Sequence, residues 1–146
     1  MSGNGNKIVL LDTSAFLAFL LDEEGGDKVH QILLQAKGRH VKALVCFITI
    51  TELYYRIFRN EGEDAAKEVL STLMSLPLTV VHSNDRLNLV AGRLKAGHRL
   101  SLADAYIAAT AMVHQAALVH KDPEFEALSA QVQLIGLPYK IKKSLS

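Results

Sequence analysis

Five short apolar runs, which alternate with segments of helical pattern, constrain the fold of this chain most strongly. Most are apolar throughout and lack the in-out alternation of a sheet with one solvated face, so we expect strands covered on both faces. This pattern predicts a parallel α/β sheet, in which right-handed crossovers bring the carboxyl ends of all strands to one edge. The runs occupy residues 7–12, 42–49, 78–83, 117–122 and 132–137.

Helical patterns fill the segments between these runs. The Ala-rich segment 101–116 is apolar almost all round, which predicts a central, buried helix. With 146 residues, of which 49% are hydrophobic, the chain has the material for one domain with one core. We expect flexible tails at 1–6 and 140–146. The other expected helices span 14–21, 27–36, 51–60, 63–76, 85–97 and 123–130.

The charge balance and the single cysteine exclude several classes of protein. Sixteen basic and fifteen acidic residues leave a net charge of +1, so a nucleic-acid site must be local rather than global. Cys46 lies in an apolar run and is expected to be an inert core residue, which excludes a disulfide scaffold and a cysteine-based zinc cluster. No apolar run reaches the roughly 18 residues that span a bilayer. These features predict a cytoplasmic protein without a membrane partner.

Four acidic residues stand at expected strand-to-helix junctions or helix starts: Asp12, Glu52, Asp104 and Asp122. Each has an ordinary structural explanation. Asp12 can cap the helix that begins near residue 14, and Asp122 can cap a helix that has proline at its first position. Glu52 follows Thr49, and Asp104 follows Ser101, at the three-residue spacing of a capping box.

Taken together, however, these acids predict a metal site. Like charges a few Å apart repel by a few kcal/mol at an effective dielectric constant near 20. No Lys or Arg lies within two residues of Asp12, Glu52 or Asp104, and only Lys121 adjoins Asp122. Clusters of carboxylate oxygens without His or Cys prefer Mg²⁺ or Mn²⁺. We therefore expect the four acids to share a divalent metal ion at one edge of the sheet.

Four motifs resemble those of the PIN-domain ribonucleases and, within that family, of the VapC-type toxins. They are LLDTSAFLAFL (10–20), ITELYYRI (50–57), HRLSLADAYIAATA (98–111) and ALVHKDPEFE (117–126). The resemblance runs from about Ile8 to Leu137. It implies a single PIN-like domain of three α/β/α layers around a five-stranded parallel sheet, and hydrolysis of RNA phosphodiesters with Mg²⁺ or Mn²⁺.

The resemblance also assigns site residues. Asp12, Glu52, Asp104 and Asp122 match the acidic quartet of the family, and Ser14 matches a small hydroxyl residue that supports the site. His120 departs from the pattern, because the family usually has Thr or Ser two residues before the last acid. Near this position Glu124 or Glu126 can assist, and His82 and His120 are the histidines expected closest to the site.

A metal-dependent endoribonuclease, acting as the toxin of a type II toxin–antitoxin pair, is the function that this resemblance implies. Its partners would be RNA, a cognate antitoxin and a second copy of the chain. For RNA contacts we expect Lys121, Arg86 and Arg99, with Lys95 and the tail lysines 140, 142 and 143 as further candidates. We expect core or dimer packing, rather than base stacking, for the aromatic residues Tyr54, Tyr55 and Phe58.

Three alternatives stay open at this point. The chain can be an RNA-processing PIN nuclease without an antitoxin, or a catalytically idle PIN-like interaction module, a possibility that His120 keeps open. A phospho-acceptor receiver domain also has an acidic Mg²⁺ pocket. It requires an adjacent pair of acids after the first strand, however, and LLDTS offers only one.

Overall fold

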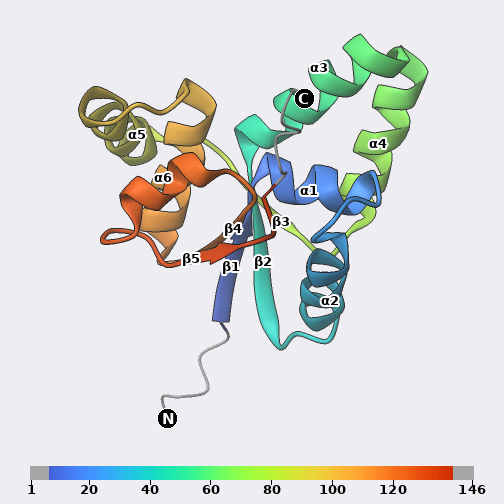
Figure 1. Ribbon diagram of the computed structural model, residues 1–146, viewed down its shortest axis with the longest axis horizontal. Coiled ribbons are helices and arrows are strands. Elements are labelled where there is room, and N and C mark those ends of the chain that lie inside the picture. Colours follow the sequence, from blue (N-terminus) through green and yellow to red (C-terminus); the bar gives the residue numbers. More distant parts are fainter. Residues whose placement is uncertain (1–6, 140–146) are drawn as a thin grey trace, which may run out of the picture.

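The computed structural model describes residues 7–139 and contains a five-stranded parallel sheet (Figure 1). The strand order is β3-β2-β1-β4-β5, and all four strand pairs are parallel. This confirms the predicted α/β class and the five-stranded parallel sheet. The strands are β1 (Lys7–Leu11), β2 (Val41–Cys46), β3 (Thr79–Val81), β4 (Ala117–His120) and β5 (Leu134–Gly136).

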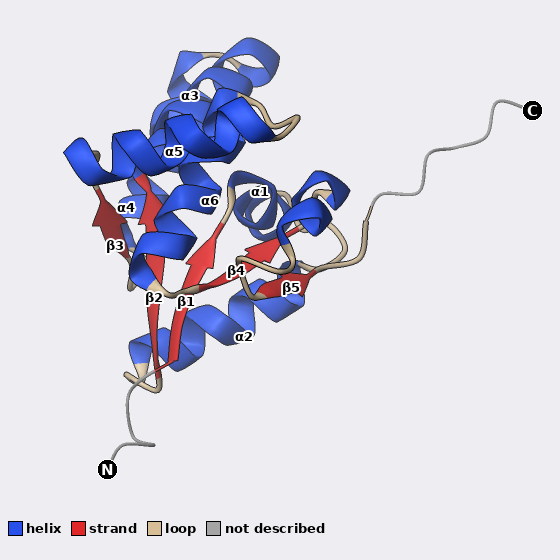
Figure 2. Ribbon diagram, turned by 90° about the vertical axis from the view of Figure 1, so that its left-hand side faces the viewer, coloured by secondary structure: helices blue, strands red, loops and turns tan. Residues whose placement is uncertain are grey.

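Helices cover both faces of the sheet and form the two outer layers (Figures 1 and 2). Successive residues of β1 point to opposite faces, so Val9 and Leu11 pack into one core cluster and Leu10 into the other. One face carries α1 (Thr13–Leu20), α2 (Gly26–Lys37), α3 (Phe47–Glu61) and α4 (Glu63–Ser75). The other face carries α5 (Asp85–Gly97), α6 (Leu102–His114) and the 3₁₀ helix η2 (Pro123–Leu128).

Helix α6 is the buried helix that the Ala-rich segment predicts. Ala105, Ala108 and Ala109 are fully buried, and their small side chains let α6 pack closely against the sheet. Cys46 is also fully buried, as expected, and its Sγ lies 3.3 Å from the Thr110 Oγ1 that donates to it. Within the described residues, no helix combines the length and the hydrophobicity needed to cross a bilayer.

Two of the differences from the predicted elements lie near the acidic residues. The strand expected at 42–49 ends at Cys46, and α3 starts at Phe47 without a side-chain cap. Thr49 and Glu52 therefore lie inside α3, so the predicted capping box does not form there. Thr49 is fully buried and its hydroxyl is hydrogen-bonded to that of Thr13 of α1, so its side chain takes part in tertiary packing rather than in a local cap. In addition, the predicted helix at 123–130 is a six-residue 3₁₀ helix.

The strand order reverses at β1, because the chain first adds β2 and β3 on one side and then β4 and β5 on the other. In open α/β sheets, ligands bind beyond the carboxyl ends of the strands at such a switch point. At that position the Asp12 amide donates to the Val119 carbonyl at 3.0 Å, which ties the ends of β1 and β4 together. Functional side chains are therefore expected just after Leu11 and His120.

Candidate metal and catalytic site

Asp12 leaves the carboxyl end of β1 and caps α1, as predicted. Its Oδ1 accepts the Ala15 amide at 2.7 Å, and the Ser14 hydroxyl lies within 2.8 Å of both of its carboxylate oxygens. Ser14 Oγ in turn accepts the Lys121 amide at 3.0 Å. Ser14 thus connects the Asp12 carboxylate to the backbone that follows β4, a geometry consistent with a supporting role.

The Asp12 carboxylate is buried and lies near two other acids, Asp104 and Asp122. It is 3% exposed, and burial raises its pKa from 3.8 to about 7, because the hydrogen bonds from Ala15 and Ser14 do not compensate for lost hydration. The charges of Asp104 and Asp122 raise this pKa further. Among residues 7–139 neither ion pair of the structure involves Asp12. The ionised form of Asp12 is thus unfavourable near neutral pH unless a positive charge close by stabilises it.

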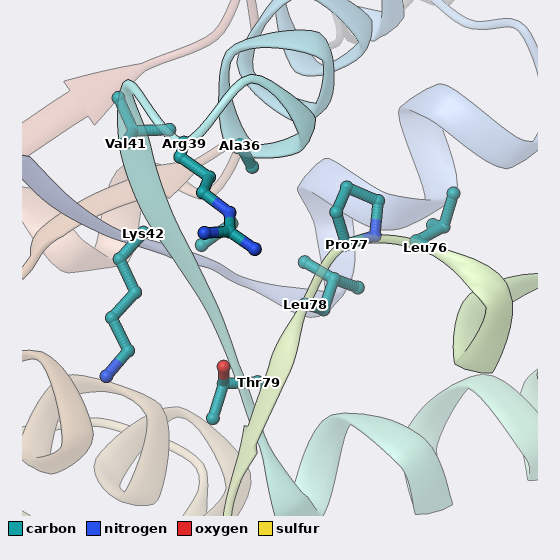
Figure 3. Close-up of a pocket in the computed structure, with 9 residues that line it drawn as sticks. Ala36, Arg39, Val41, Lys42, Leu76, Pro77, Leu78 and Thr79 are labelled. Carbon is teal, nitrogen blue, oxygen red and sulfur yellow. The ribbon is translucent and has the colours of Figure 1, made fainter.

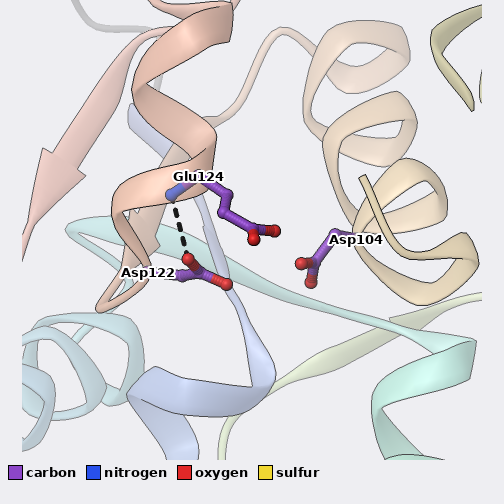
Figure 4. Close-up of side chains that lie close together, drawn as sticks. All are labelled: Asp104, Asp122 and Glu124. Carbon is purple, nitrogen blue, oxygen red and sulfur yellow. Dashed lines mark hydrogen bonds between the residues drawn. The ribbon is translucent and has the colours of Figure 1, made fainter. Parts of the chain in front are cut away.

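Three other acids come together next to the end of β1 (Figure 4). Asp104, Asp122 and Glu124 each have a carboxylate oxygen within 4.8 Å of the other two. Asp122 caps η2, as predicted, by accepting the Glu124 amide at 2.9 Å. Asp104 lies in the first turn of α6, where its amide donates to the capping Ser101 hydroxyl at 3.1 Å. We call these three residues the acidic triad.

The acidic triad concentrates negative charge in a partly buried place. Burial raises the pKa of Asp104 from 3.8 to about 6, and the charges of Asp122, Glu52 and Glu124 raise it as well. These donors are all hard oxygens, the ligands that Mg²⁺ and Mn²⁺ prefer. The triad and the adjacent Asp12 therefore fit a divalent cation both in ligand chemistry and in charge.

Glu52 approaches the site from α3, but it is held differently. The Thr13 hydroxyl donates to Oε1 at 2.7 Å, and Arg56 forms an ion pair with Oε2 at 3.3 Å. Glu52 is not one of the three acids whose carboxylate oxygens lie within 4.8 Å of one another. Arg56 was not among the predicted residues, because it lies four residues from Glu52 rather than next to it. The spacing of four residues on a helix was the signal that could have found it.

His120, the departure from the family pattern, is a structural neighbour of the acidic triad. It is 1% exposed, its Nδ1 accepts the Asp122 amide at 3.2 Å, and its ring contacts Phe125 edge-on. Burial lowers its pKa, which favours the neutral ring that this hydrogen bond requires. The His120 ring nitrogen thus accepts the backbone N–H of the last acid, Asp122, as a hydroxyl oxygen at this position could.

Of the other residues predicted to lie near the site, only one belongs to the acidic triad. Glu124 belongs to the acidic triad, whereas Glu126 accepts the Tyr139 hydroxyl at 2.8 Å and is not part of it. His82 is exposed after β3, the edge strand two positions away from β1.

The predicted RNA contacts lie on loops and helix surfaces. The Lys121 ammonium donates to the Glu24 carbonyl at 2.6 Å, and Lys95 donates to the Leu100 carbonyl. Arg86 and Arg99 are exposed. Their contact with RNA stays a prediction, and the tail lysines 140, 142 and 143 lie outside the described residues.

The exposure of two aromatic residues of α3 contradicts the predicted core packing. Tyr55 and Phe58 are 40% and 43% exposed, so core packing is wrong for these two residues. Tyr54 is half-buried, and its ring lies 5.7 Å from that of Phe58. The exposed rings leave dimer packing as the surviving prediction.

A hollow of about 340 Å³ lies at the opposite edge of the sheet (Figure 3). Arg39, Val41 and Lys42 line it near the start of β2, and Leu76 and Pro77 line it from the segment that precedes β3. No acidic side chain lines this hollow. It is therefore separate from the acidic triad, which lies beyond the carboxyl ends of the strands.

Comparison with known families identifies the class of protein that this fold and acidic site define. The family model described as "PIN domain" matches residues 9–131, which is most of the chain. The chain therefore belongs to the PIN domain family. A search of curated protein sequences found no match.

Solved structures show the same fold at low sequence identity. A chain of VapBC2 from Rickettsia felis, bound to a promoter DNA fragment, has a TM-score of 0.73 and 20% identity over 90% of this chain and 99% of that chain. DNA-bound VapBC from Salmonella typhimurium gives 0.71 and 19%, over 90% and 98%. VapC20 from Mycobacterium tuberculosis, described as a sarcin–ricin loop cleaving toxin, gives 0.67 and 18%, over 89% and 99%.

Proposed function

We propose that this protein is a metal-dependent endoribonuclease and that Asp12, Glu52, Asp104 and Asp122 form its catalytic acidic group. The observation that carries the proposal is the acidic triad beside the buried Asp12 carboxylate at the switch point of the sheet. An ordinary set of helix caps does not need four acids, since Ser, Thr and Asn cap equally well. A bound cation gives this concentration of carboxylates a physical reason.

Mg²⁺ or Mn²⁺ is the proposed cofactor. When bound, such an ion lowers the pKa of water and neutralises charge that develops on the phosphate. Asp104, Asp122 and Glu124 would hold it, because their oxygens already lie close together. Asp12, fixed by Ser14 and Ala15, would add a fourth carboxylate with little freedom to move.

The proposed reaction is hydrolysis of an RNA phosphodiester. Water attacks the phosphorus in line with the 3′ oxygen, and the bond between phosphorus and the 3′ oxygen breaks. The 3′ oxygen takes up a proton, so the products are a 5′-phosphate and a 3′-hydroxyl. No serine, cysteine or histidine nucleophile is required. His120 is occupied with the Asp122 amide, and Ser14 is occupied with Asp12 and Lys121, so each has a positional role instead.

We also propose that the protein is the toxin of a type II toxin–antitoxin pair. The support comes from the structural neighbours, which include DNA-bound VapBC complexes and one chain described as a sarcin–ricin loop cleaving toxin. A cognate antitoxin and a second copy of the chain are the proposed protein partners. The exposed Tyr55 and Phe58 on α3 provide apolar surface for such contacts.

Cleavage of RNA tests this proposal. Purified protein is incubated with structured and single-stranded RNAs in Mg²⁺, Mn²⁺ or EDTA, and Asp104→Asn is compared with wild type and with Glu68→Gln, an exposed acid on α4. We expect metal-dependent cutting with 5′-phosphate ends in wild type and Glu68→Gln, and loss of cutting in Asp104→Asn. Folded wild-type protein that does not cut with either metal, or equal cutting by Asp104→Asn, would move the assignment to an interaction module.

A further inference from the structure

The two ion pairs of the described chain have the same helical spacing but different surroundings. Glu63 and Lys67 on α4 have side chains that are 51% and 64% exposed, as is usual for a surface pair that contributes little to stability. In the other pair the Arg56 side chain is 44% exposed, whereas that of Glu52 is only 12% exposed. In the Arg56–Glu52 pair, the solvent-accessible Arg56 side chain is thus held in place by the largely buried Glu52 carboxylate.

The Glu52 carboxylate is already engaged at both oxygens. Thr13, which is itself buried, donates to one oxygen at 2.7 Å, and Arg56 pairs with the other at 3.3 Å. The Thr13 hydroxyl also lies 3.1 Å from that of Thr49, so α1 and α3 together hold the carboxylate. A carboxylate neutralised in this way needs a metal ion less than Asp12 does.

Arg56 also lies within electrostatic range of the acidic triad. Burial lowers the pKa of its guanidinium, but the contact with Tyr55 and the charges of Glu52 and Asp104 outweigh burial and raise that pKa. Thr13, which donates to Glu52, directly follows Asp12 in the chain. The Glu52–Arg56 pair is therefore held beside Asp12, at the edge of the acidic site.

The Arg56 guanidinium has more donors than the Glu52 pair uses, and its side chain is 44% exposed. A guanidinium has five N–H donors in a planar fork that matches the oxygens of a phosphate, and the structure engages one of its nitrogens with Glu52. A phosphodiester that approaches four acids is repelled by them until positive charge offsets the repulsion. A fixed arginine at the rim of the acidic group offsets part of it.

We propose that Arg56 contacts the RNA phosphate next to the cleaved bond, and that Glu52 and Thr13 hold Arg56 in place rather than Glu52 binding the metal ion. This inference rests on the proposed nuclease function and divides its acidic group into two parts. The acidic triad and Asp12 hold the ion. Glu52 acts through Arg56 on the substrate.

Four single variants, together with the double variant Glu52→Gln/Arg56→Gln, separate these roles. Mn²⁺ binding is measured by electron paramagnetic resonance, and kcat and KM are measured on a single-stranded RNA at several salt concentrations. The variants are Glu52→Gln, Arg56→Gln, Asp104→Asn and the control Arg59→Gln, which removes an arginine of the same helix that stacks on Tyr55 instead of pairing with an acid.

We expect Arg56→Gln to bind Mn²⁺ within threefold of wild type or more tightly, since a positive charge is removed near Asp104. Its KM should rise about tenfold, which is in the range for loss of one charge-assisted hydrogen bond. The dependence of KM on salt concentration should weaken by the amount expected for one lost phosphate contact. Glu52→Gln should resemble it, and the double variant should lose little more than either single variant. Asp104→Asn should weaken Mn²⁺ binding more than tenfold, and Arg59→Gln should match wild type.

The outcomes distinguish this inference from the proposed function. If wild type binds Mn²⁺ and cuts RNA but Arg56→Gln has an unchanged KM, or if Glu52→Gln loses Mn²⁺ as Asp104→Asn does, the inference is overturned and the nuclease stands. If wild type neither binds Mn²⁺ nor cuts, the proposed function itself is overturned.

Discussion

Asp12→Asn removes the most strongly buried charge of the site, and its effect on stability can be worked out from the structure. Burial raises the pKa of Asp12 from 3.8 to about 7, a difference of about 3 units. At about 1.4 kcal/mol per unit, the ionised carboxylate costs the folded state roughly 4 kcal/mol, as an upper value. Asparagine keeps an oxygen that can accept the Ala15 amide without carrying this charge.

The sign of the pH dependence follows from the direction of this shift. Because the pKa is higher in the folded protein, folding is favoured most below pH 3.8, and that stability is lost as the pH rises through about 7. In EDTA, Asp12→Asn should therefore be more stable than wild type at pH 8, by about 2 to 4 kcal/mol, and should differ little at pH 4. Mg²⁺ should stabilise wild type at pH 8 and stabilise Asp12→Asn much less.

Urea unfolding at pH 4 and pH 8, with EDTA or with Mg²⁺, measures these differences. Glu68→Gln serves as the control, because it removes an exposed acid of α4 and should not depend on pH or on metal in the same way. An Asp12→Asn variant that is less stable than wild type at pH 8 in EDTA would refute the reasoning, since the carboxylate would then stabilise the fold without a cation.

Three further predictions concern the neighbourhood of the site and the core. His120→Leu should lose the acceptor for the Asp122 amide, weaken Mn²⁺ binding about tenfold and lower the free energy of unfolding by about 1 to 3 kcal/mol, while His120→Asn should restore much of the Mn²⁺ affinity in a calorimetric titration. Ser14→Ala should lower the free energy of unfolding by about 1 kcal/mol in urea, because Asp12 loses a hydrogen-bond donor, and an unchanged value would argue against that link. Phe16→Ala should cost about 3 to 5 kcal/mol, since this ring is fully buried, and a loss below about 1 kcal/mol would contradict its place in the core.

The sequence was sufficient for the parallel sheet because its strands are buried on both faces. Val9, Leu10 and Leu11 are each at most 2% exposed, so the run reads as apolar without alternation. The caps at Asp12 and Asp122 were also predictable, because each depends on neighbours within three residues.

Features that depend on tertiary contacts were not predictable in the same way. Helix α3 begins at Phe47, and Thr49 contacts Thr13 of α1 instead of capping the helix; the three-residue spacing to Glu52 gave no sign of that contact. The pairing of Glu52 with Arg56 did have a local signal, because residues four apart are neighbours on a helix surface. Glu124 was one of two candidates, and only the course of η2 placed it beside Asp104.

Binding of a divalent metal ion by the acidic triad is the central claim, and a crystal grown with MnCl₂ tests it most directly. Anomalous scattering at the manganese edge locates the ion without reference to activity. We expect an anomalous peak among the carboxylates of Asp104, Asp122 and Glu124, close to Asp12. Full occupancy of a site elsewhere, or an acidic triad without a peak at millimolar Mn²⁺, would contradict the claim.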